Sequence, residues 1–217
     1  MALSGSSRMP ELDDFFNEID LARIRRAKEL SEVKRSFGRM TSGDVYGVAS
    51  KAVVVLAYAS WEGFYNECVR TYIRFLVRKG GKVRDADWLL LVSAFQSDFE
   101  SMRGRNHSLE SRQQFVENLK TKIDCGYDAI DTTIVEAKSN LDFARVAQNY
   151  GLLNFDLSTM QSVRNRLDKE LVGWRHAVAH GDSPDLTTMD IEAHVDFAAS
   201  LLVLIADRFQ YAMLARV

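Results

Sequence analysis

The chain has few of the residues that interrupt helices or cross-link a fold. Only two prolines occur in 217 residues, which favours long helices over strands and tight turns. Cys68 and Cys125 have no metal-type or redox-type spacing, so we expect reduced thiols in a reducing compartment. No run approaches about 18 uninterrupted apolar residues, and the first ten residues lack the apolar core of a signal peptide. We therefore expect a cytoplasmic protein without a membrane span.

Neither sign of charge dominates. Lys and Arg total 28 against 30 Asp and Glu, for a net charge of −2. Bulk charge therefore does not indicate a nucleic-acid partner, and an anionic partner must meet a local patch. Glycine-rich phosphate loops, G-x-S-x-G elbows and paired-carboxylate motifs are also missing, which leaves few routes to catalysis.

Apolar residues recur at helical spacing along most of the chain, which predicts an all-α fold. Residues 1–10 are expected to form a flexible lead-in and residues 11–217 a single all-α domain. Within it, helices are predicted at 11–38, 45–79, 86–104, 109–122, 141–150, 159–180 and 187–215. We expect the second to be buried on every side at 52–59, Asn140 to cap the fifth, and Thr187 or Thr188 to cap the last. The irregular segment 123–139 includes a β-leaning TTIV; such loops are usually functional or mobile.

The residues best suited to chemistry lie in WRHAVAHG, residues 174–181. The predicted helix that carries them buries one apolar stripe, formed by Met160, Val163, Leu167, Leu171, Trp174 and Val178. At about 100° per residue, His180 falls about 180° from Leu171 and about 40° from His176. Both imidazoles should therefore point outward, with Arg175 at the edge of the stripe. Gly181 should end the helix in a left-handed conformation.

A metal site is one interpretation of the two histidines. Histidines four residues apart share a helix face and can bind zinc, but zinc requires a third and usually a fourth ligand. Residue 177 is alanine, where a HExxH protease has its general-base glutamate. Asp182 or His194 would have to complete such a site, although His194 is expected to pack in the core. Since a solvated pair near a helix C-terminus is the simpler interpretation, we expect no metal or other cofactor.

Phosphodiester cleavage would use all three side chains. Without a metal, RNA cleavage needs a proton taken from a 2′-hydroxyl, a proton given to the leaving 5′-oxygen, and a cation at the phosphate. Histidine suits the proton transfers, and arginine suits the phosphate. Arg175 and His180 are separated by about 140° around the helix axis. Two copies facing each other across a two-fold axis would therefore form a better cleft than one helix.

Arg175 and His180, five positions apart, match the Arg-(four to six residues)-His motif of the HEPN superfamily. NLDFARVAQNYGL, then RLDKELVGWRHAVAHGD, then a long amphipathic last helix, resemble the MAE-type HEPN branch found beside toxin–antitoxin and restriction-type defence genes. The resemblance covers roughly residues 45–215 and is strongest at 140–210. It implies a HEPN-like helical bundle, here with additional N-terminal and connecting helices.

The resemblance implies a metal-independent endoribonuclease that acts as a homodimer, leaves 2′,3′-cyclic phosphate ends and serves as toxin or effector of a prokaryotic defence or toxin–antitoxin system. Arg175 would hold the scissile phosphate and His180 would be the general acid and base. His176, in a position often occupied by asparagine, would support one of them. Asp182 stands where one subclass has a tyrosine that is modified, so that regulation is not implied. The implied partners are RNA, a second copy, and a cognate antitoxin or neighbouring defence protein.

Alternatives remain open. One alternative is a non-catalytic HEPN module that dimerises and holds RNA or protein. Another is a metal-dependent hydrolase that uses His176 and His180. Glu62 is interpreted as an ordinary ion pair in the bundle or as the group that orients Arg175. Clustered basic residues could follow a phosphate backbone, although solvated helix ends are the commoner explanation. These are Arg70, Arg74, Arg78, Lys79, Lys82 and Arg84; Arg23, Arg25, Arg26 and Lys28; and Arg103, Arg105 and His107.

Overall fold

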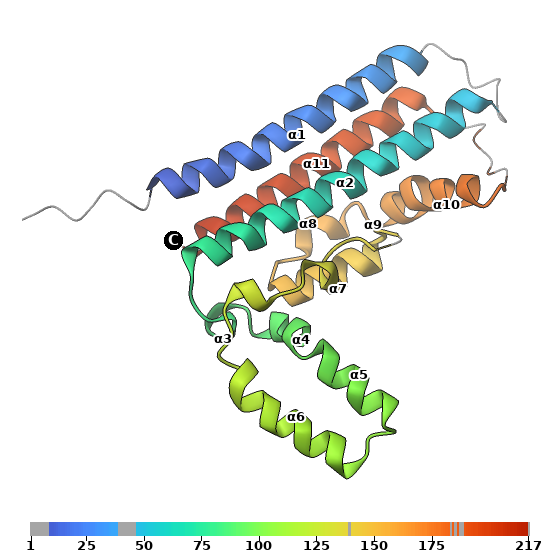
Figure 1. The fold of residues 1–217 in the computed structure, drawn as a ribbon. Coiled ribbons are helices and arrows are strands. Elements are labelled where there is room, and N and C mark those ends of the chain that lie inside the picture. The colour runs from blue at the N-terminus through green and yellow to red at the C-terminus, as the bar shows by residue number, and fades with distance from the viewer. Residues whose placement is uncertain are drawn as a thin grey trace, which may run out of the picture.

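The computed structural model describes residues 9–38, 47–138, 140–182, 184, 186 and 189–216. Over these ranges the chain is predominantly helical and contains no β-strand; the one extended contact is an isolated bridge between Lys82 and Gly126. The predicted all-α fold is confirmed (Figure 1). Most of the expected lead-in, residues 1–8, lies outside the described residues, but Met9 and Pro10 already belong to the first helix.

Three long helices run side by side and form the main layer (Figure 1). They are α1 (Met9–Phe37), α2 (Val48–Lys79) and α11 (Ile191–Leu214), and each packs against the other two. The expected apolar stripe of α11 is buried, from Ile191 through Ala198 to Phe209. By length and composition α11 could cross a membrane. One face of α11, from Ile191 to Met213, is buried, and the helix packs against α1 and α2.

The expectation that α2 is buried on every side at 52–59 is wrong. Val55 and Leu56 are 40% and 42% exposed, whereas Trp61, Tyr65 and Tyr72 further along the helix are fully buried. The apolar run therefore does not mark the centre of the core, because the described part of the chain places no helix over that face. The large aromatic side chains of the following turns do mark it.

A second layer packs on α2, with α7 (Phe143–Leu153), α8 (Ser158–Gln161), α9 (Arg164–Arg166) and α10 (Trp174–Ala179). The helix predicted at 159–180 is confirmed only in part. It breaks at residues 162–163, and Leu167–Gly173 between α9 and α10 is π-helical. A Cβ at Gly173 would lie 2.9 Å from the Asp168 carbonyl oxygen, so glycine permits this wider turn. A π-segment often marks a functional site.

The caps of two predicted helices differ from expectation. Asp142, not Asn140, caps α7, because its side chain accepts the backbone N–H of Arg145. The helix also passes Gly151 and ends at Asn154, which adopts the left-handed conformation at φ 56°. At α11 the cap is Asp190; Thr187 and Thr188 lie outside the described residues. Asn140 is thereby left for another contact.

A helical hairpin projects from the bundle (Figure 1). The predicted helix 86–104 is broken into α3 (Val83–Ala86), a 3₁₀ turn at Trp88–Leu90, α4 (Leu91–Ala94) and α5 (Gln96–Gly104). The predicted helix 109–122 is confirmed as α6 (Leu109–Lys122), capped by Ser108. Phe95, Phe99 and Phe115 pack together between α5 and α6. The TTIV patch is a 3₁₀ turn, Thr132–Ile134, and not a strand.

Side chains of α2 hold Val135, Ala137 and Leu141 against the bundle by hydrogen bonds to their backbone groups. Tyr65 Oη donates to the Val135 carbonyl at 3.0 Å, and Trp61 Nε1 donates to the Leu141 carbonyl at 3.1 Å. The Leu141 N–H donates to Tyr58 Oη, and the Ala137 N–H donates to the Asn66 side chain, both at 2.8 Å. Because these groups are largely buried, losing one bond would leave an unsatisfied polar group at a cost of about 1–3 kcal/mol. The end of the irregular segment therefore has a defined position.

A buried ion pair joins the end of α11 to the base of the hairpin. Asp87 is fully buried and binds the Arg216 guanidinium with both carboxylate oxygens, while Tyr127 Oη donates to the same carboxylate. The guanidinium also lies 5.5 Å from the centroid of the Tyr72 ring. Removing one member of a buried pair leaves the other charge without compensation.

We expect Asp87→Ala to lower the free energy of unfolding by about 3–5 kcal/mol, since Arg216 would remain buried without its carboxylate. Urea denaturation followed by circular dichroism measures the change. The matched control is Asp128→Ala, an exposed acid on the adjacent turn, expected to change stability by less than about 0.5 kcal/mol. Equal effects of the two substitutions would contradict the assignment.

Candidate functional site

The end of α10 has the geometry expected of the WRHAVAHG sequence. Gly181 adopts φ 81°. Its N–H donates to the Val178 carbonyl at 3.2 Å, and the Asp182 N–H donates to the Ala177 carbonyl at 2.9 Å. These two bonds form a Schellman motif. His180 is the last residue before the left-handed glycine, so its backbone position is well defined by the helix end.

His176 and His180 lie next to each other on the exposed side of α10. Both side chains are exposed, and their ring centroids are 4.3 Å apart with an angle of 51° between the rings. The outward orientation predicted from helical spacing is confirmed. The two imidazoles therefore offer neighbouring, solvent-accessible nitrogens to a ligand at this end of α10.

Arg175 extends in another direction, toward α2. Its Cζ atom lies 4.4 Å from the centroid of the Tyr58 ring, and its Nη1 donates to Asn140 Oδ1 at 2.8 Å. The guanidinium is partly buried and fixed between a ring face and an amide. Among the contacts of the described residues, none joins Arg175 to His176 or His180. One chain therefore brings the two histidines together but not the arginine with them.

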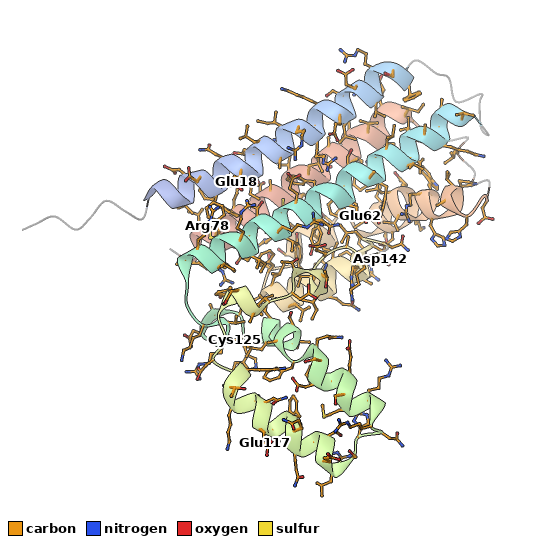
Figure 2. The ribbon with its side chains drawn as sticks, viewed as in Figure 1. Glu18, Glu62, Arg78, Glu117, Cys125 and Asp142 are labelled. Atoms are coloured by element: carbon orange, nitrogen blue, oxygen red, sulfur yellow. The ribbon has the colours of Figure 1, made fainter. Side chains whose placement is uncertain are left out.

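An open pocket of about 330 Å³ lies beside the guanidinium. Its lining comes from one face of α2 and from α10, namely Val55, Tyr58, Ala59, Glu62, Gly63, Asn66 and Arg175. Figure 2 labels Glu62 at the middle of α2. Burial, together with a hydrogen bond to Glu62, raises the pKa of Tyr58 well above its ordinary value. The phenol therefore keeps its proton beside the Glu62 carboxylate.

Glu62 and Arg175 both line this pocket, and the charge of each acts on the Tyr58 hydroxyl. Of the two interpretations of Glu62, the ordinary ion pair has no counterpart among the contacts of the described residues. Tyr58 and Asn140 were not expected at the site, since one was assigned to the core and the other to a helix cap. The spacing of Tyr58 and Glu62, four residues apart on one helix face, was the available signal. Nothing local indicated Asn140.

Most of the clustered basic residues form ion pairs with acidic side chains. Arg70 pairs with Glu136, Arg74 with Glu18, and both Lys82 and Arg84 with Asp124. On α1, Arg23, Arg25 and Arg26 pair with Asp20, Glu67 and Glu29. Arg78, labelled in Figure 2, lies over the Phe75 ring. These contacts favour solvated helix faces over a phosphate track.

His194 packs against the core side of α10 and is separate from the exposed pair His176 and His180. It is buried and stacks on Trp174 with ring centroids 5.4 Å apart, and neither ring nitrogen has a hydrogen-bond partner among the described residues. The expected packing role is confirmed. Within the described ranges, no group of three His, Cys, Asp or Glu side chains is arranged to hold a metal ion. His194 therefore cannot complete a zinc site with the exposed histidines from where it lies.

Burial lowers the pKa of His194 to about 4, with Glu170 raising it and Arg166 lowering it in smaller measure. The unfolded residue has its ordinary pKa near 6.5. The stability that the neutral form provides is therefore complete above about pH 6.5 and is lost as the pH falls toward 4, by on the order of 3 kcal/mol.

We expect His194→Phe, which keeps a ring against Trp174 but does not titrate, to lose less stability than the native protein between pH 7 and pH 4.5. Urea denaturation at several pH values measures this difference. The control His107→Asn changes an exposed histidine at φ 56°, a conformation that asparagine tolerates. It should follow the native curve. Parallel curves for native protein and His194→Phe would refute the assignment.

Comparison with known proteins adds one finding. The model of the RiboL-PSP-HEPN family matches residues 21–211, most of the chain. No curated protein and no solved structure matches it. The match confirms the HEPN resemblance; the MAE-type branch and the roles of the Arg-His motif stay predictions.

Proposed function

This chain belongs to the RiboL-PSP-HEPN family, and on that premise we propose that it is a metal-independent endoribonuclease that works as a homodimer. His180 is its general acid and base, Arg175 holds the scissile phosphate, and His176 supports the proton transfer. The observation that carries the proposal is the end of α10, where two exposed imidazoles are in contact on the short helix that also carries the fixed guanidinium of Arg175.

The chemistry divides between the two kinds of side chain. One imidazole removes the proton of the 2′-hydroxyl, whose oxygen attacks phosphorus, and the 5′-oxygen leaves with a proton from an imidazolium. A 2′,3′-cyclic phosphate and a 5′-hydroxyl result. One N–H group of Arg175 donates to Asn140, which leaves most of its five N–H donors available for phosphate oxygens. Single-stranded or looped RNA suits this route because its backbone can reach the in-line geometry.

The homodimer follows from the two directions in which α10 presents its side chains. Arg175 extends toward α2 while the histidines face solvent. A second copy related by a two-fold axis would bring its own histidines to the arginine side of the first. Each cleft would then combine Arg175 of one protomer with His180 of the other. A role as toxin or effector in a prokaryotic defence or toxin–antitoxin system, cytoplasmic and restrained by a cognate protein, is the biological setting we propose.

Arg175→Ala and His180→Ala should each reduce RNA cleavage by about 100-fold or more, the usual share of a general acid-base group or a phosphate-binding cation. Cleavage of labelled RNA, measured with and without chelator, tests this. Chelator should leave the rate unchanged, and the 3′ ends should carry cyclic phosphate. The exposed His107→Ala control should retain full activity.

Two results would count against the proposal. Cleavage that survives both substitutions would show that another site or a contaminant is responsible. Binding of RNA or protein by the native chain, with no cleaved product under any condition, would instead support the non-catalytic HEPN module.

Mixing the two inactive variants tests the shared cleft. A heterodimer of Arg175→Ala and His180→Ala keeps one cleft with both native groups if each cleft draws them from different protomers. With random exchange of protomers, we expect activity to return to about a quarter of the native value. The measurement is cleavage after denaturation and joint refolding, with each variant refolded alone as control. No recovery would place arginine and histidine of one cleft on the same protomer.

A further inference from the structure

The pocket beside Arg175 contains polar groups that the cleavage chemistry does not use. Tyr58, Glu62 and Asn66 follow one another at four-residue intervals on the same face of α2, and all three line the pocket. Side chains so spaced lie one above another along a helix. Together they place a phenol, a carboxylate and an amide in a row along the axis of α2, in the pocket that the Arg175 guanidinium also lines.

The carboxylate of Glu62 has acceptor capacity left over. It lines the pocket beside Tyr58, and an ionised carboxylate has about four acceptor positions. Glu62 is partly buried, and no ion pair with it occurs among the described residues. Its carboxylate therefore has acceptors available to a ligand in the pocket.

Asn66 adds a hydrogen-bond donor to the pocket. Its Oδ1 accepts the Ala137 backbone N–H at 2.8 Å, which fixes the orientation of the amide. The Nδ2 group makes no hydrogen bond among the described residues and remains available as a donor of two N–H bonds. The pocket therefore offers a carboxylate acceptor one helical turn from an amide donor.

The volume and the lining favour a single flat ring. About 330 Å³ is at the lower end of the range for small-ligand sites, which begins near 300 Å³. Val55, Ala59 and Gly63 provide the apolar surface between the polar groups. One face of the Arg175 guanidinium covers Tyr58, and a nucleobase can stack on the face of a guanidinium. A second phosphate would be repelled by Glu62, and a cation by Arg175.

We infer that this pocket binds a guanine base adjacent to the phosphate held by Arg175. Among the four RNA bases, guanine alone has two neighbouring donors, N1–H and N2–H, beside an acceptor, O6, on its Watson–Crick edge. Glu62 accepts from the two donors and Asn66 Nδ2 donates to O6. Adenine and cytosine would place a ring nitrogen acceptor against the carboxylate, and uracil would place a carbonyl there.

This inference rests on the proposed endoribonuclease function for its RNA source, since the same chemistry would also bind a free guanine nucleotide. In an RNA strand the pocket would select guanine at one fixed position relative to the cut. A bidentate base contact discriminates by about 1–3 kcal/mol, which corresponds to a preference of about 5-fold to 150-fold.

The first experiment maps cleavage ends on an RNA of mixed sequence. The native protein should show guanine enrichment at one position beside the cut, and Glu62→Gln, which replaces the carboxylate by an amide of the same size, should abolish it. Glu117→Gln is the matched control, because Glu117 is an exposed acid on the projecting hairpin, away from Glu62 in Figure 2. It should keep the native preference. Cleavage without guanine enrichment, or enrichment unchanged in Glu62→Gln, would overturn the inference and leave the proposed function standing.

The second experiment measures binding without cleavage. His180→Ala protein is titrated with a short oligoribonucleotide that contains one guanine, and with copies in which inosine or 7-deazaguanine replaces it. Inosine lacks the N2 amino group, so we expect binding about tenfold weaker. The 7-deaza change lies on the opposite edge and should have no effect. Equal affinity for guanine and inosine would refute the carboxylate contact.

The third experiment separates the two sources of guanine. GMP, AMP, CMP and UMP are titrated into the native protein and into Glu62→Gln and followed by NMR. Weak GMP binding that needs Glu62, together with guanine-dependent cleavage, supports the RNA pocket. Selective GMP binding that needs Glu62, in a protein that neither cleaves nor binds RNA, assigns the pocket to a free nucleotide and refutes the endoribonuclease. Failure of both GMP and RNA to show a Glu62-dependent guanine preference overturns the pocket itself.

Discussion

The fold depends on hydrogen bonds from the central helix to a segment without regular structure. Tyr58, Trp61, Tyr65 and Asn66 of α2 are paired with backbone groups of Val135, Ala137 and Leu141. The three aromatic side chains are buried and Asn66 is half-buried, and an unpaired donor or acceptor in a protein interior is costly. The segment is therefore held in one position, and that position places Asn140 against Arg175. A loop that serves as a fixed wall of the site is a direct consequence of satisfying the polar atoms of a buried helix.

The second constraint is the winding of the chain into α10. Leu167–Gly173 is π-helical, and this segment rotates the residues after it relative to an uninterrupted α-helix. Asp168, inside the segment, accepts the backbone N–H of Phe143 at 2.8 Å, so the wider turn is also fixed to the start of α7. Beyond it, Trp174 stacks on His194 on the core side while the two exposed histidines face solvent. One short helix thereby presents three chemically different sides.

These constraints give the site an uneven electrostatic pattern. A fixed guanidinium and a carboxylate line the same pocket, and no ion pair joins them among the described residues, so the arginine retains donors for an anion. Elsewhere the bases are largely paired with acids on neighbouring helices. The cationic character of Arg175 is therefore local, as the near-zero net charge of the chain requires. An RNA would be attracted to a particular place and not to a broad basic face.

Patterns along the chain are enough to predict the helical class, the amphipathic last helix, the outward histidines and the glycine that ends α10. Each of these follows from the spacing of residues within one helix or from the φ that one residue tolerates. Three features could not be predicted in this way: the partial exposure of 52–59, the π-segment in the motif helix, and the contact of Asn140 with the arginine in place of a cap on α7. Those outcomes depend on which face a neighbouring helix covers and on which buried polar group needs a partner. Both are properties of contacts between residues distant in the chain, which local periodicity does not encode.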